Sequence, residues 1–270
     1  MRRIRQALAG LAVVAVGAAI GMFSVTPGYA ADTSKVSVVH GIPGQPVDVY
    51  VNGKKTLPNF QPATVAGPLE LPAGKYDIVL TKPGDPITSP ILKVDQAAVP
   101  GGANISLVAH LTADGKPTLT PFVNDTSKLA VGKARLIVRH TAAAPAVDVR
   151  AGGQPVLKNL TNPNQAKAEV TAGSLSADVV LAGTSTVVLG PANLTLAEGT
   201  ATIVYAIGSA TDKTLTLVVQ KIEGLHSNPS GVPSGTGGRA DTGAAWWVYV
   251  LIAVGAALLL GGGYRQVRRV

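Results

Sequence analysis

The stretch Pro46-Val47-Asp48-Val49-Tyr50-Val51-Asn52-Gly53 decides the fold class. Its three valines alternate with Asp48, Tyr50 and Asn52, and this period of two is typical of a half-buried β-strand. The Asn-Gly pair that ends it favours a tight turn. No stretch between Asp32 and Gly224 keeps a helical period, so we predict an all-β protein. Nine further apolar runs predict strands at 36–40, 76–81, 104–111, 118–123, 135–140, 147–150, 177–181, 200–207 and 215–222.

The same pattern recurs 100 residues further along the chain, where Ala146-Val147-Asp148-Val149 repeats Pro46-Val47-Asp48-Val49. Matches continue in the same order through the later turns, with small changes of offset, which indicates a duplicated domain. Short strands with frequent glycine and proline turns predict tandem β-sandwich domains of immunoglobulin-like type. We place these domains at 31–123 and 134–223, with a linker at 124–133.

Two segments of the first copy carry a family resemblance. Val38-Val39-His40-Gly41-Ile42-Pro43, continued by the stretch quoted above, and Leu71-Pro72-Ala73-Gly74-Lys75-Tyr76 resemble the bacterial domain-of-unknown-function family numbered 4397. The second copy departs from the pattern, with Thr141-Ala142-Ala143 in place of Gly41-Ile42-Pro43. The resemblance covers most of residues 36–222 and implies an extracellular β-rich module, often in tandem, here in a surface-anchored protein of actinobacterial type. It implies no activity and no functional residues.

Composition excludes several kinds of chemistry. The absence of cysteine rules out disulfides, thiolate nucleophiles and Cys-ligated metal sites. The formal charge of +8 is concentrated at the chain ends, because removing three arginines from each end leaves 17 Lys+Arg against 15 Asp+Glu. With no basic stripe and no interleaved aromatics, nucleic acid is not an expected partner. Hydrolase and nucleotide-binding motifs are missing, so we expect no metal, no cofactor and no enzymatic activity.

The N-terminus is typical of an exported protein. Residues 1–30 begin with a basic segment, continue with an apolar run at 7–23 and end in small residues. This order predicts a signal peptide, cleaved between Ala30 and Ala31. An uncleaved anchor is the alternative, because the apolar run is longer than usual.

The C-terminus predicts a membrane anchor. Residues 244–263 carry no charge and are long enough to cross a bilayer as a helix. The positive charge that follows, on Arg265, Arg268 and Arg269, predicts that the tail at 264–270 lies in the cytoplasm and the domains lie outside.

The segment before this helix, 224–243, is rich in Gly, Ser and Pro and predicts a disordered stalk. Its last residues, Ala240, Thr242 and Gly243, resemble the cell-wall sorting signal of Gram-positive bacteria, although Arg239 stands where a leucine is expected. If a sortase acts here, the chain is cut after Thr242 and the helix is discarded. The other interpretation is a permanent membrane helix after an ordinary stalk.

Histidine and aspartate recur at equivalent positions in the two copies, as His40 with His140 and Asp48 with Asp148. Such a pair can orient a general base or a metal ligand. Strand parity instead places both histidines on the apolar side at strand ends, so we predict structural histidines bonded to nearby backbone. The aspartates lie on the other side and are predicted to face solvent or to cap a turn.

The leading hypothesis is an exported, membrane- or wall-anchored surface protein with a structural, adhesive or ligand-binding role and no catalysis. Its partners would be the membrane, a sortase and an extracellular protein or glycan. An exported enzyme acting on cell-envelope polymers is the alternative. A sensory role ranks third, because the tail of seven residues, Tyr264–Val270, has no room for a signalling domain.

Overall fold

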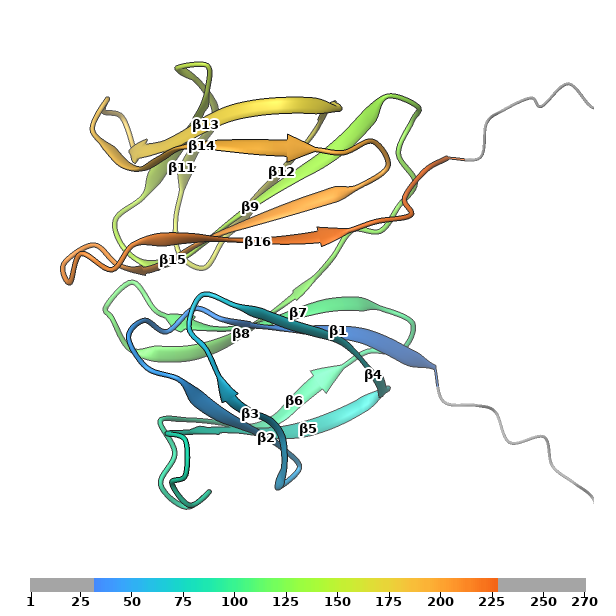
Figure 1. Ribbon diagram of the computed structural model, residues 1–270, viewed down its shortest axis with the longest axis vertical. Helices are drawn as coiled ribbons and strands as arrows, with labels where there is room; N and C mark the ends of the chain where they lie inside the picture. Colours follow the sequence, from blue (N-terminus) through green and yellow to red (C-terminus); the bar gives the residue numbers. More distant parts are fainter. Residues whose placement is uncertain (1–31, 228–270) are drawn as a thin grey trace, which may run out of the picture.

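The computed structural model describes residues 32–227, which form four sheets of four strands stacked in four layers (Figure 1). The prediction of an all-β protein is therefore confirmed. In this described part of the chain, no helix is long and apolar enough to cross a membrane. The signal peptide with its Ala30–Ala31 cleavage, the sorting motif, the membrane helix and the basic tail lie outside the described residues.

Module 1, residues 33–123, contains eight strands in two sheets. The strands are β1 (Thr33–His40), β2 (Val47–Val51), β3 (Lys54–Phe60), β4 (Val65–Pro72), β5 (Gly74–Thr81), β6 (Leu92–Val99), β7 (Asn104–Leu111) and β8 (Pro117–Val123). The outer sheet has the order β3-β2-β5-β6 and the inner sheet has the order β4-β1-β7-β8. Every pair of neighbours is antiparallel except β1 and β7, which are parallel.

Module 2, residues 133–222, repeats this topology strand for strand. Its strands are β9 (Lys133–Ala143), β10 (Val147–Ala151), β11 (Gln154–Leu160), β12 (Gln165–Thr171), β13 (Gly173–Leu181), β14 (Val187–Leu196), β15 (Ala201–Ser209) and β16 (Thr216–Ile222). The outer sheet is β11-β10-β13-β14 and the inner sheet is β12-β9-β15-β16, with β9 and β15 parallel. The identical strand orders agree with the duplication that the sequence predicts.

Each module encloses an apolar core between its two sheets, as in a β-sandwich. In module 1, Val36 and Leu107 of the inner sheet pack with Val49 and Ile78 of the outer sheet. Val138, Val149, Val179 and Val204 build the corresponding core of module 2. Burying apolar side chains contributes about 1.5–3 kcal/mol per residue, so these cores supply much of the stability of a chain without disulfides.

A third core lies between the modules. The inner sheets, which are equivalent in the two copies, pack face to face through the apolar side chains of Val39, Val108, Phe122, Ile137, Ile203, Tyr205, Ile207 and Val218. The central strands of the two inner sheets are consequently buried on both faces, and every residue of β15 is buried. The two modules therefore form one continuous body of four layers.

The segment expected to link the modules packs against module 2. Leu129 is 1% exposed, its backbone N–H donates to the carbonyl of Leu225, and it forms a parallel bridge with His226. Residues 224–227, the start of the expected stalk, thus lie on the body. Figure 1 shows both described ends leaving the molecule on the same side.

Candidate functional site

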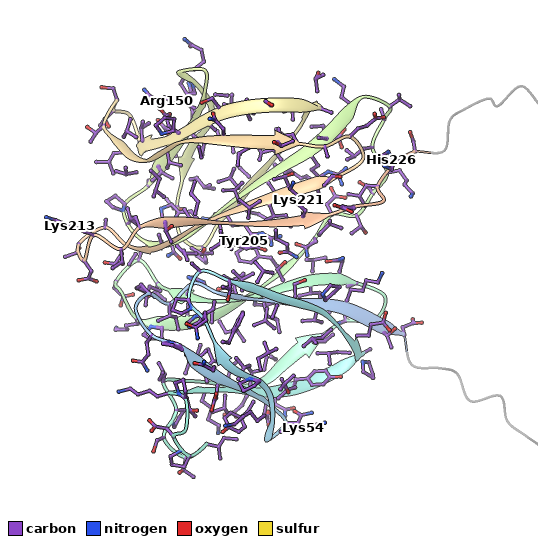
Figure 2. All side chains as sticks on the ribbon, viewed as in Figure 1. Lys54, Arg150, Tyr205, Lys213, Lys221 and His226 are labelled. Carbon is purple, nitrogen blue, oxygen red and sulfur yellow. The ribbon has the colours of Figure 1, made fainter. Side chains whose placement is uncertain are left out.

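The interface between the modules contains a buried polar network centred on Arg139 of β9. This side chain is fully buried, and its guanidinium donates to Tyr205 Oη (2.7 Å), Asn124 Oδ1 (2.7 Å) and Gln165 Oε1 (2.9 Å). The guanidinium carbon also lies 4.4 Å from the centre of the Phe122 ring. Tyr205, seen between the modules in Figure 2, comes from β15 of module 2, whereas Phe122 and Asn124 come from module 1 and its exit.

All three acceptors of Arg139 are neutral, so its charge is held by dipoles and aromatic faces. Burial lowers the pKa of Arg139 and raises the pKa of Tyr205. Tyr205 Oη donates in turn to Gln220 Oε1 (2.6 Å), which also accepts from Ser106 Oγ (2.9 Å) of module 1. Because a buried charge is costly unless its hydrogen bonds are made, this network fixes the relative position of the two inner sheets.

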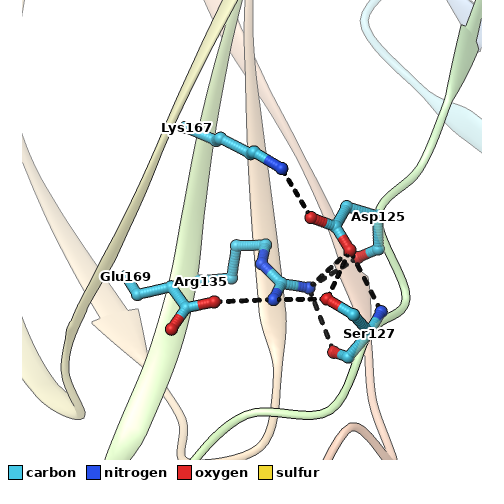
Figure 3. A network of polar contacts seen from close by, with 5 residues as sticks. All are labelled: Asp125, Ser127, Arg135, Lys167 and Glu169. Atoms are coloured by element: carbon cyan, nitrogen blue, oxygen red, sulfur yellow. Dashed lines mark hydrogen bonds and ion pairs between the residues drawn. The ribbon is translucent and has the colours of Figure 1, made fainter.

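A second network, shown in Figure 3, attaches the connecting segment to module 2. Arg135 is 2% exposed and forms ion pairs with Asp125 (3.3 Å) and Glu169 (2.8 Å). It also donates to the carbonyls of Asp125 and Ser127. Lys167 binds the other oxygen of Asp125 (2.7 Å), and its hydrogen bond is the main reason that the pKa of Asp125 is lowered.

A polar groove of about 300 Å³ opens between the modules at the end where the chain ends leave. Lys35 and Asn104 of module 1 line it together with Ile222 and Glu223 from the end of module 2. Its size is at the lower end of the range for small-ligand sites. The hollows inside the two sandwich cores are smaller, about 20 and 30 Å³, and almost entirely apolar.

The prediction that His40 and His140 are structural is confirmed. Their Nε2 atoms lie 2.9 Å from the carbonyl oxygens of Gln45 and Pro145, so each Nε2–H donates to backbone. Burial lowers the pKa of both rings, which keeps them neutral near pH 7. The copies differ at Nδ1, which accepts from the Ala142 N–H at 3.4 Å in module 2 but has no partner in module 1.

The third buried histidine, His110, faces the module interface. Its Nδ1 lies 2.8 Å from the Leu111 carbonyl and its Nε2 lies 2.8 Å from Thr120 Oγ1. Burial is the main cause of its lowered pKa, and the nearby His140 lowers it further. Both nitrogens are therefore engaged in holding the neutral ring in place.

Asp48 and Asp148 cap turns, as one of the two predicted alternatives states. The carboxylate of Asp48 accepts from the backbone N–H groups of Asn59 (2.8 Å) and Gly84 (3.2 Å), and Asp148 bonds the equivalent loops. Asp48 is 3% exposed, so the expectation that it faces solvent is wrong. Its ion pair with Lys55 (2.6 Å) and these backbone bonds lower its pKa to about 2.

The predicted topology and processing residues, Arg265, Arg268, Arg269, Ala240, Thr242 and Gly243, lie outside the described residues. Sequence reasoning did not single out Arg135, Arg139, Tyr205 or Gln220, which build the interface. Two arginines four residues apart, and so on one face of a largely apolar strand, 134–139, are the signal that could have found the arginines. Among residues 32–227, no group of three or more His, Cys, Asp or Glu could hold a metal ion.

Comparison with known proteins agrees with the resemblance noted in the sequence. No curated protein matches the chain. The family described as "Domain of unknown function (DUF4397)" matches residues 34–150, which comprise nearly all of module 1 and strands β9 and β10 of module 2. This part of the chain is thus similar in sequence to that family, and the expected resemblance of the second copy beyond residue 150 stays a prediction. Module 2 repeats the strand order of module 1.

Proposed function

We propose that the protein is an exported, membrane- or wall-anchored surface protein that displays two joined β-sandwich modules in a structural, adhesive or ligand-binding role without catalysis. The expected signal peptide and C-terminal anchor supply the location. The DUF4397 match supplies no activity. The proposed role therefore depends on which end of the two-module body would face away from the membrane.

One observation carries it: eight of the fifteen connections between the described strands lie at the end opposite to the chain ends (Figure 1). Every odd-numbered strand runs toward that end, so eight loops meet there. They are residues 41–46, 61–64, 82–91 and 112–116 of module 1, and 144–146, 161–164, 182–186 and 210–215 of module 2. An anchor after Ser227 would turn this loop end away from the membrane, and loops on a rigid scaffold commonly carry recognition.

The loop end is shared by both modules. The side-chain amide of Asn162 in module 2 donates to the carbonyls of Leu111 in module 1 (2.8 Å) and Ala142 in module 2 (2.7 Å). The longest of the eight loops, 82–91, has ten residues, whereas its counterpart 182–186 has five. A partner would therefore meet one fixed surface on which the module 1 loop is the larger feature.

Protease treatment of intact cells tests the location. We expect the modules to be released from the cell surface, and the same digestion of lysed cells to give no additional release. Modules that stay intact in whole cells and appear in the cytosolic fraction would contradict the proposal.

A graft tests the role of the loop end. Replacing residues 82–91 by the sequence of 182–186 keeps the glycine whose N–H binds the capping aspartate, since Gly84 and Gly183 make equivalent bonds. We expect the full chain, used as bait on native envelope fractions, to retain a specific protein or glycan that the grafted chain retains less. Equal retention by bait and graft would argue against recognition by this loop.

A further inference from the structure

The duplication predicts two equivalent charged contacts across the module interface, one at Lys35 and one at Arg135, but the two places differ. Lys35 of β1 pairs in register with β7 as Arg135 of β9 pairs with β15, so the two cations are equivalent. Asp125 follows β8 and Glu223 follows β16 at equivalent places, two residues beyond Val123 and Lys221. By this equivalence Lys35 should meet Glu223 as Arg135 meets Asp125.

Of these two contacts, only the one between Arg135 and Asp125 is formed as an ion pair within the described residues. Arg135 is buried and lies 3.3 Å from Asp125, with the connecting segment folded over it. Within residues 32–227, Lys35 and Glu223 are both exposed and form no ion pair with any residue. The groove of about 300 Å³ lies between them, because the chain after Glu223 turns away to pair with Leu129.

The groove therefore presents opposite charges together with neutral polar groups. Asn104 accepts from Asn124 through its Oδ1 (2.7 Å), which leaves its amide N–H groups as donors at the groove. Thr126 adds a hydroxyl group, and Ile222 contributes an apolar surface. A ligand that satisfies this lining carries an anionic group for Lys35 and a cationic group for Glu223.

We propose that the groove binds a small zwitterion with a free ammonium and a free carboxylate, as found in an amino acid or a short unblocked peptide. The carboxylate lies at Lys35 and accepts from Asn104, and the ammonium lies at Glu223. The site is at the end opposite to the loops, so it does not depend on the proposed function.

The test uses the purified full chain and measures binding of alanine, dialanine and trialanine by calorimetry and by NMR line broadening of the ligand. We expect saturable binding, with the preferred member of the series reporting the spacing of the two charges and separating amino acid from peptide. N-acetylation or C-terminal amidation of that member each removes one charge and should weaken binding about fivefold or more.

Lys35→Met and Glu223→Gln should each weaken binding by a similar factor, whereas Lys213→Met, in the distant β15–β16 turn labelled in Figure 2, should leave it unchanged. Lys35→Met should in addition become insensitive to amidation of the carboxylate, and Glu223→Gln to acetylation of the amine. Thermal melts check that each variant folds. The proposal is overturned if no probe saturates, if blocked and free peptides bind alike, or if folded groove variants match the Lys213 variant.

Discussion

Tyr205→Phe is the sharpest test of the interface, because it removes one oxygen and leaves the packing of the ring. That oxygen accepts from Arg139 Nη1 (2.7 Å) and donates to Gln220 Oε1 (2.6 Å), and Tyr205 itself is fully buried. After the change, Gln220 still accepts from Ser106, but the guanidinium loses one of its three acceptors in a site that water does not reach.

The expected cost follows from these two bonds. A hydrogen bond to a charged group contributes about 1.5–3 kcal/mol and a neutral one about 0.5–1.5 kcal/mol. Because Phe fills the same space, there is little cavity term, and we expect Tyr205→Phe to lower the free energy of unfolding by about 2–4 kcal/mol. For a body of this size that corresponds to a fall in Tm of about 5–15 °C.

The measurement is urea and thermal unfolding of the full chain by circular dichroism near pH 7.5. Tyr76→Phe is the matched control, since its hydroxyl donates to the Pro72 carbonyl (2.8 Å) but is exposed, and we expect it to cost less than about 0.5 kcal/mol. Because the third core joins the modules, both should unfold in one transition. Equal stabilities of the two variants, or two separate transitions of which only one responds, would refute this account of the interface.

Three further changes have expected outcomes. Burial lowers the pKa of His110 in the folded state below the ordinary 6.5, so the neutral ring stabilises the fold above pH 6.5 and this stabilisation is lost as the pH falls below 6.5. His110→Gln should therefore flatten the decline in Tm between pH 6.5 and 5. Asp48→Asn should lower the free energy of unfolding by about 1–2 kcal/mol, more than Asp148→Asn in the same denaturant titration, because only Asp48 is buried with a lysine partner. At pH 2, near the Asp48 pKa of about 2, most of the difference between the two variants should disappear. Gly41→Ala brings a methyl group within 2.9 Å of Ile207 across the interface and should lower Tm, whereas Gly74→Ala, whose nearest contact is 3.7 Å, should not.

Ten of the sixteen strands follow from the sequence, and the six that do not are all at sheet edges: β3, β4, β6, β11, β12 and β14. A central strand is paired on both sides and buried, so its apolar pattern is strong, as in 104–111. An edge strand is half exposed and can contain proline, as β4 does at Pro68 and β14 at Pro191, so its pattern resembles that of a loop. Because these edge strands were not recognised, the order of strands in each sheet could not be predicted from the sequence.

The interface was the harder part to predict, because periodicity shows which face of a strand is polar but not what covers that face. In β9, Leu136, Val138 and His140 point into the sandwich, and Arg135 and Arg139 point the other way. On a lone sandwich, such arginines would be solvated. Here module 1 and the segment that follows it cover them, and each cation is retained because a neighbouring element brings acceptors to it. Within residues 32–227 no such element reaches Lys35, and this difference between the two copies is the feature on which the zwitterion proposal stands.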